Sequence, residues 1–451
     1  MTKGKRLKSG LINSAVRMLA MLIILLSVYI IVGRQMVTLV SDYRVLVQDQ
    51  VSDILGVEVD IGNLTGAWEG FGPKVIIKQV RIGQEFEIGG IEVVPALLSS
   101  FIQGRFVASN ITFSDIRVIV TKVSTDGGWS LSDWVVKSAD NNVLNNDGVS
   151  VKTAFERLQP LLIQDHIALS NLAVILAVDD TEPLIVQIEH AWLESVFDTK
   201  KLSLDGWIFS GQQSANIGLV AELDQWLSAP AGRIYLRQEY FDWSAWTGFL
   251  PGNIGLSRLS TDLEAWLTLD AGTVVEVRSR LDIPEIAVTR DKRQVAVQNI
   301  HTELTATIAA DETFAWLDNV SFQYKGEQWQ HSLHQLYYSP DSVELLSDKV
   351  DVGLLSALGE VMTDNRVLKG LEPSGKLLNS RILWTPAADP IDQLLIQGRF
   401  EDAEINPWRG VPGLKGIDGF VDMTLAGGYL KIAPSDAWID LPKVFDAPVF
   451  L

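Results

Sequence analysis

The chain has 451 residues, a formal net charge of −19 and no cysteine. Phosphate backbones repel so acidic a protein, which argues against nucleic-acid binding. The absence of cysteine excludes disulfides, thiolate zinc sites, iron–sulfur clusters and thiol catalysis. The charge is unevenly distributed, because residues 1–34 carry six basic and no acidic side chains.

An apolar segment near the N-terminus predicts a membrane anchor. Met18–Gly33 has no charged residue, and its apolar character extends over residues 15–40, enough for the ~20 residues that cross a bilayer. No small-residue cleavage motif follows, so we expect the segment to be retained rather than removed as a signal peptide. The basic residues place a tail, 1–14, in the cytoplasm. The body then lies beyond the membrane, which for an inner-membrane anchor in a Gram-negative cell means the periplasm.

After the anchor, residues 41–55 predict an amphipathic helix that ends before Gly56. Residues 56–451 form one region in which apolar and polar residues alternate, as in strands with one apolar face. In "STDLEAWLTLD", Ser260–Asp270, the leucines point one way while Glu264 and Trp266 point the other. The other segments with a strand-like pattern are, in chain order, Lys74–Gly83, Phe106–Val123, His166–Val178, Pro183–Leu193, Ser214–Leu223, Thr273–Val288, Asn299–Ala309 and Gln393–Phe400.

Helical patterns are few and short in this region. Val151–Ile163 and Val352–Met362 are the best candidates, and Ser138–Ser150 is typical of a polar loop. No helix alternates regularly with the strands, which argues against a parallel α/β fold. One-sided strands usually cover a core made with a second sheet or helices. The alternative is a long, curved antiparallel sheet whose apolar face lines an open groove, and the shortage of helices favours this groove or a partly closed barrel.

Motifs for nucleotide or metal binding are incomplete. Gly370–Leu377, "GLEPSGKL", lacks the final Ser or Thr of a phosphate-binding loop. His331 and His334 have a spacing that would place them on one face of a helix, but their neighbours indicate a strand, in which the two side chains face opposite sides. We therefore predict no metal site and no cofactor.

Candidate carboxylates for glycoside hydrolysis are equally weak. Glu264 beside Trp266 and Asp242 beside Trp243 have the residue types of such a site. Carboxylates on the polar face of a strand are more often solvated, and no pair of them stands out. With no catalytic residue to assign, we predict that the protein is not an enzyme.

One block of sequence carries a family resemblance. Leu55–Ile82, "LGVEVDIGNLTGAWEGFGPKVIIKQVRI", resembles the N-terminal region of the AsmA-like superfamily and, within it, the YhdP family. A helix follows the anchor, then a short strand pattern, then Trp68 with a turn rich in glycine, and then another strand. Pro373–Trp384 and Phe400–Ile432 resemble the same family in the same order. Family members are considerably longer, so we expect this chain to correspond to their N-terminal portion.

The resemblance implies a fold and a function. Proteins of this family are similar to bridge-like lipid transfer proteins, which are anchored in the inner membrane and form a taco-shaped, repeating β-groove in the periplasm. It implies phospholipid transport between the inner and outer membranes without covalent chemistry, with phospholipids, the inner membrane and a periplasmic or outer-membrane protein at the distal end as partners. The alternative is an envelope-assembly scaffold that binds outer-membrane proteins by strand pairing.

The cleanest alternations supply candidate residues for the groove lining. For any one of them, ordinary packing in a core is the competing interpretation. The candidates are Ile217, Leu219, Leu223, Leu263, Leu267, Leu269, Val275, Val277, Leu281, Leu394, Ile396 and Phe400.

Overall fold

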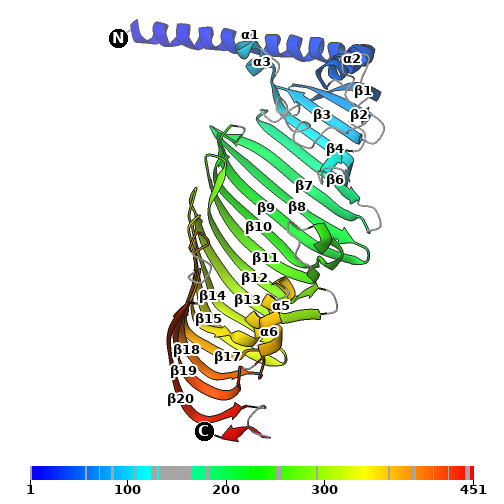
Figure 1. Cartoon of the computed structure of the whole chain (residues 1–451). Coiled ribbons are helices and arrows are strands. Elements are labelled where there is room, and N and C mark those ends of the chain that lie inside the picture. Colours follow the sequence, from blue (N-terminus) through cyan, green and yellow to red (C-terminus); the bar gives the residue numbers. More distant parts are fainter. Residues whose placement is uncertain are drawn as a thin grey trace. The chain divides into compact units, whose positions relative to one another are not determined.

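The protein is mainly β-structure, with an apolar helix at the N-terminus and few short helices elsewhere (Figure 1). The chain divides into two compact units, Met1–Gln212 and Gln213–Leu451. The computed structural model describes residues 3–55, 58–70, 72–82, 86–104, 107–122, 129–131, 164–177, 182–226, 228–249, 256–290, 293–363, 366–388, 393–409, 411–424, 426–441 and 447–450.

The first unit begins with helices and continues with strands. Its helices are α1 (Lys3–Val37), the 3-10 turn η1 (Val40–Tyr43), α2 (Arg44–Leu55) and α3 (Leu97–Gln103). Its strands are β1 (Val59–Glu69), β2 (Gly72–Ile82), β3 (Phe86–Pro95), β4 (Ala108–Lys122), β5 (Trp129–Leu131), β6 (His166–Ala177), β7 (Leu184–Val196) and β8 (Thr199–Ser210).

The second unit consists of strands with three short helical segments. These segments are η2 (Ser244–Phe249), α5 (Val352–Thr363) and α6 (Arg366–Leu371). The strands are β9 (Gln213–Asp224), β10 (Ala231–Asp242), β11 (Leu256–Asp270), β12 (Thr273–Arg290), β13 (Arg293–Ile308), β14 (Thr313–Tyr324), β15 (Glu327–Tyr338), β16 (Val343–Asp351), β17 (Ser374–Trp384), β18 (Leu394–Ile405), β19 (Gly413–Thr424), β20 (Gly427–Asp440) and β21 (Val449–Phe450).

Nearly all described strand pairs are antiparallel and join neighbours in the chain, as predicted. The exception is β4 with β6, which pair in parallel from Ile111 opposite Ile167 to Thr121 opposite Ala177. Parallel neighbours require a long connection, and more than forty residues separate Lys122 from His166. The sheet is therefore mostly antiparallel, as expected from the sequence, with this one parallel pair.

The predicted elements agree with the structure wherever it describes them. The segment 41–55 contains the end of η1 and all of α2, and Val352–Met362 lies within α5. Each predicted strand segment overlaps one strand. The predicted helix Val151–Ile163 and the polar loop Ser138–Ser150 lie outside the described residues.

Irregular residues interrupt many strands near their middle. A positive φ costs least at Gly, Asn and Asp. Where such a residue is an insertion in one strand of a pair, it bends that strand and increases its twist. In β14, the bulge at Asn319 moves the apolar positions from 315 and 317 to 320 and 322. The non-glycine residues of this kind inside strands are Gln79, Asp115, Asn171, Asn299, Asn319, Asn379 and Asp402.

Candidate functional site

The second unit carries an apolar row that crosses eleven strands, β9 to β19. Residues paired directly across antiparallel strands lie on the same face of a sheet, so the register defines the row without reference to side-chain orientation. At strand spacings of ~4.8 Å the row is roughly 50 Å long. Its members are Ala221, Ile234, Leu267, Val277, Ala306, Ala315, Leu336, Leu345, Ile382, Ile396 and Met423.

The residues predicted from the sequence gather on this face. Leu267, Val277 and Ile396 belong to the row itself. Rows on either side hold Ile217, Leu219, Leu223, Leu263, Leu269, Leu281 and Leu394. All twelve predicted residues are half-buried. Their role as a lining for a ligand remains a prediction, which the register makes geometrically consistent.

Two predicted residues lie at irregular places. Val275 has no partner in β11, because the register shifts between Thr268 and Leu269. Phe400 pairs with Leu377 on one side and with Gly419 on the other. A side chain on Gly419 would collide with the Phe400 ring, so the glycine makes room for the phenylalanine.

Sequence reasoning missed the middle of the row, from β13 to β17. Leu304, Leu317, Leu336, Leu345 and Ile382 lie on the same face as the predicted residues. Their strands contain bulges or are short, so the alternation breaks off after a few residues. The alternation in "ELTATI", Glu303–Ile308 of β13, was the local pattern from which this part of the face could have been predicted.

The apolar face of the second unit has a hollow near β18–β20. The hollow has a volume of about 230 Å³ and only apolar accessible surface. Leu430 and Ile432 at its edge are strongly exposed. Such apolar exposure is unusual unless something binds there.

The same face also carries a small uncharged polar group, the polar seam, which consists of Ser332, His334 and Ser347. His334 pairs with Leu317 on the strand before it and with Ser347 on the strand after it. The two ring nitrogens of His334 lie 3.0 Å from Ser332 Oγ and 2.8 Å from Ser347 Oγ. Burial lowers the pKa of His334 below its ordinary value of 6.5, so the imidazole is neutral at pH 7. The seam is therefore hydrogen-bonded and uncharged.

The opposite face carries charged and aromatic side chains, as the alternation in β11 predicted. Glu264 pairs with Arg237 and Arg280, and Trp266 with Tyr235 and Arg278. Tyr235 donates a hydrogen bond of 3.0 Å to Glu264. Burial and this bond raise the pKa of Tyr235. Glu264 is thus held in a surface network of strands β10–β12.

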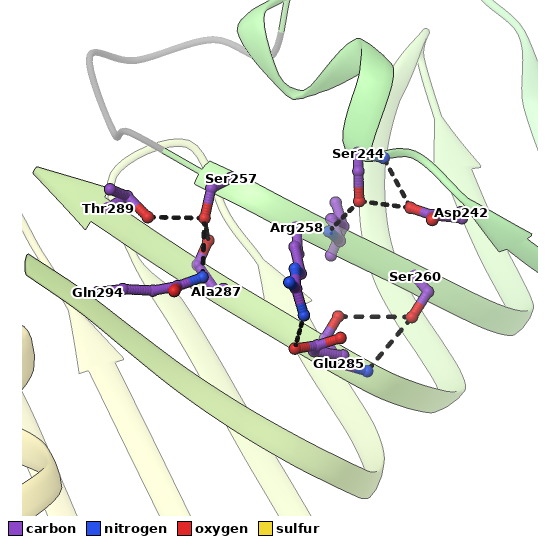
Figure 2. A network of polar contacts seen from close by, with 10 residues as sticks. Asp242, Ser244, Ser257, Arg258, Ser260, Glu285, Ala287, Thr289 and Gln294 are labelled. Carbon is purple, nitrogen blue, oxygen red and sulfur yellow. Dashed lines mark hydrogen bonds and ion pairs between the residues drawn. The ribbon is translucent and has the colours of Figure 1, made fainter.

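Asp242, the other carboxylate considered for catalysis, stabilises a turn (Figure 2). It accepts a 2.9 Å hydrogen bond from the Ser244 backbone N–H and another from the Ser244 hydroxyl, where η2 begins. Nearby, Arg258 Nη1 lies 2.7 Å from Glu285 Oε1, and Ser260 Oγ accepts the Glu285 N–H at 3.2 Å. These contacts fix η2 at the end of β10 and join β11 to β12, and they account for the side chains without a substrate. Among the described residues, no group of three or more His, Asp or Glu could hold a metal ion.

The first unit has its own apolar rows across β1–β4 and β6–β8. One of them consists of Leu64, Ile77, Ile91, Phe113, Leu169, Ala191 and Leu204. Val47 and Val51 of α2 pack against the cluster that contains Val59, Ile61 and Leu64. At this end, therefore, a helix covers the apolar face.

The same helix α2 caps the first strand through polar residues spaced one turn apart. Arg44 donates to the Ile61 carbonyl at 2.9 Å, Gln48 Oε1 accepts the Ile61 N–H at 3.2 Å, and Ser52 Oγ accepts the Val59 N–H at 3.0 Å. Backbone groups of this kind on an edge strand otherwise recruit another strand. The side chains of α2 therefore occupy this stretch of β1.

Two comparisons with known proteins agree with this architecture. A family model described as "YhdP protein" matches residues 1–451. The "Intermembrane phospholipid transporter YhdP" of Escherichia coli (strain K12) is 20% identical over 448 aligned residues, which cover 90% of this chain and 32% of that protein. The chain thus spans about a third of the length of this relative.

Proposed function

Because the chain belongs to the YhdP family, we propose that it carries phospholipids between two membranes along its apolar rows. The observation that supports this most directly is the uncharged row across β9–β19, whose residues are mostly half-buried rather than packed in a closed core. Acyl chains require a continuous apolar surface, since each CH₂ group exposed to water costs about 0.8 kcal/mol.

The rows suit movement better than fixed binding. Each step from one strand to the next presents side chains of the same kind, so a lipid tail meets a nearly uniform surface. A single tight site would slow release. Transfer of this kind forms and breaks no covalent bond, so we assign the protein no enzymatic activity.

Helix α1 supplies the anchor in this proposal. Its segment Met18–Val37 is long and apolar enough to cross a membrane, and most of its large apolar side chains are exposed. We place it in the inner membrane with residues 1–14 in the cytoplasm and the strands in the periplasm. A periplasmic or outer-membrane protein would receive the lipid at the far end.

Strand pairing with other proteins is the competing function. It needs an accessible edge, and at β1 the side chains of Arg44, Gln48 and Ser52 already bond Val59 and Ile61. This end is therefore poorly suited to accept a strand, which favours the lipid pathway.

The test is photo-crosslinking of the full chain in cells, with a photoreactive amino acid at position 267 or at position 264. These neighbouring positions face opposite sides of β11. Mass spectrometry should find phospholipid joined to position 267 and not to position 264. Protein partners at both positions with no lipid at 267 would overturn the proposal in favour of a scaffold.

A further inference from the structure

The end of the apolar helix α1 packs directly on the first strand. The rings of Tyr29 and Trp68 lie edge to face with centroids 5.4 Å apart. Gly33 lies directly against the Trp68 ring, and a Cβ atom there would overlap it. Gly66 is in equally close contact with Val37. The β1–β2 hairpin is therefore fixed to α1 over its last two turns.

This contact lies within the membrane-length segment rather than beyond it. The segment ends at Val37, and Tyr29 and Gly33 precede that end by about 12 Å and 6 Å at 1.5 Å per residue. Trp68 thus touches α1 within the half of the membrane-length segment that is nearest to the strands. Charged groups also lie near this hairpin tip. Lys74 Nζ is 3.2 Å from a carboxylate oxygen of Glu69 and 2.7 Å from one of Glu92.

The corner that follows α1 exposes a second apolar surface. Leu39, Tyr43 and Leu46 are more than half exposed, whereas Val47 and Val51 pack inward on β1. Ser41, Asp42 and Arg44 are exposed beside these apolar side chains, and one turn later the exposed positions are polar alone, at Asp49 and Gln50. The apolar exposure is therefore confined to the part of the corner closest to the membrane segment.

From these contacts we propose that the β1–β2 tip and the outer side of the α1–α2 corner sit in the lipid leaflet into which α1 emerges. The surface formed by Leu39, Tyr43, Leu46 and Trp68 contacts bilayer lipid, and the membrane boundary lies between Leu46 and Asp49. The lipid surface is the fitting occupant because the patch adjoins the membrane-length segment of α1 and mixes apolar with polar side chains, as surfaces at the boundary between lipid tails and head groups do.

This position of the β1–β2 tip in the leaflet, called the seat below, also indicates where a lipid enters the apolar rows. This consequence rests on the proposed function. The tip end of the first strands carries the apolar row Val75, Val93 and Ile111. A lipid in that leaflet would meet these strands at the depth of its acyl chains. It would then enter the pathway without first leaving the bilayer.

The absence of cysteine makes a direct test possible. Single variants Leu46→Cys and Glu69→Cys of the full chain are labelled with a fluorophore and reconstituted into phospholipid vesicles containing spin-labelled lipid. Asp49→Cys and Glu87→Cys, on the polar side of the corner and at the opposite end of β3, are matched controls. We expect lipid quenching at positions 46 and 69 to exceed that at the controls by about twofold or more.

Equal quenching at all four positions, with the label at 69 open to aqueous iodide, would overturn the seat. Trp68→Ala should reduce quenching at position 69 while circular dichroism and membrane fractionation show that the protein stays folded and anchored. Unchanged quenching in that variant would also contradict the proposal. Lipid transfer is measured separately, so quenching without transfer refutes the transport function alone, and transfer without quenching refutes the seat alone.

Discussion

The two units build the same apolar rows and cover them differently. In the first unit, Val59, Ile61 and Leu64 are 1%, 2% and 2% exposed beneath α2. In the row of the second unit, Leu336 and Met423 are 36% and 37% exposed. Row residues under a helix are core, whereas the larger row residues of the second unit retain contact with solvent or a ligand, and its small members Ala221 and Ala306 are buried. The pattern of alternation is the same in both units. It therefore predicts which side chains share a face, but not whether that face is packed in a core or open to a ligand.

Helix α5 shows the same rule inside the second unit. Leu354, Leu358 and Val361 pack with Val295 and Phe322. These strand residues lie beyond the bulges at Asn299 and Asn319. The other halves of β13 and β14 carry the row. A bulged strand thus contributes one half to a core and the other half to the candidate pathway.

The largest expected effect comes from placing a charge in the row. Leu345→Asp should reduce phospholipid transfer between donor and acceptor vesicles by about tenfold or more, because a charged side chain among lipid tails costs roughly 2.5–3.5 kcal/mol. The matched control is Leu346→Asp, which is on the opposite face beside Arg381. The comparison between faces fails if both variants transfer lipid equally well.

A second substitution separates core from pathway through stability. Ile61→Ala should lower the free energy of unfolding by about 2–5 kcal/mol, since it removes a fully buried side chain. Leu345→Ala should cost about 1 kcal/mol, because its site is already partly exposed. Urea unfolding followed by tryptophan fluorescence measures both. Similar losses at the two positions would show that the row of the second unit is a closed core.

The smallest effect concerns the polar seam. Burial keeps the pKa of His334 in the folded protein below the value of 6.5 that it has when unfolded. On acidification the unfolded state therefore binds the proton first, and the free energy of unfolding falls as pH drops below about 7. His334→Gln should flatten this part of the pH dependence. An unchanged slope between pH 7 and 5 would mean that the imidazole does not stay neutral in the folded protein.

The sequence predicted the faces of the strands well where alternation is unbroken. In β11, Leu263, Leu267 and Leu269 share a face, and Trp266 takes the other. In β14, the pair Asp318–Asn319 shifts the alternation by one residue, so a fixed period of two misses half of the strand. Asn and Asp are also common in ordinary turns, so their local signal does not distinguish a turn from a bulge.

Tertiary pairing was the other part that the sequence could not supply. The parallel contact of β4 with β6 depends on residues far apart in the chain. The cap on β1 was partly visible as the amphipathic helix 41–55. Which polar side chains of that helix would reach the strand depended on the angle at which it docks, and helical period does not specify that angle.

The hairpin register has a consequence for how such proteins change size. Successive antiparallel strands contribute the same kind of residue to each row, so insertion of one hairpin restores both strand direction and facing. Each duplication would lengthen a row by about 10 Å and leave the flanking pairs in phase, whereas insertion of a single strand would reverse the direction of all that follows. The length of the sheet is therefore a quantity counted in hairpins, which duplication within the gene can change without disturbing the register of the strands on either side.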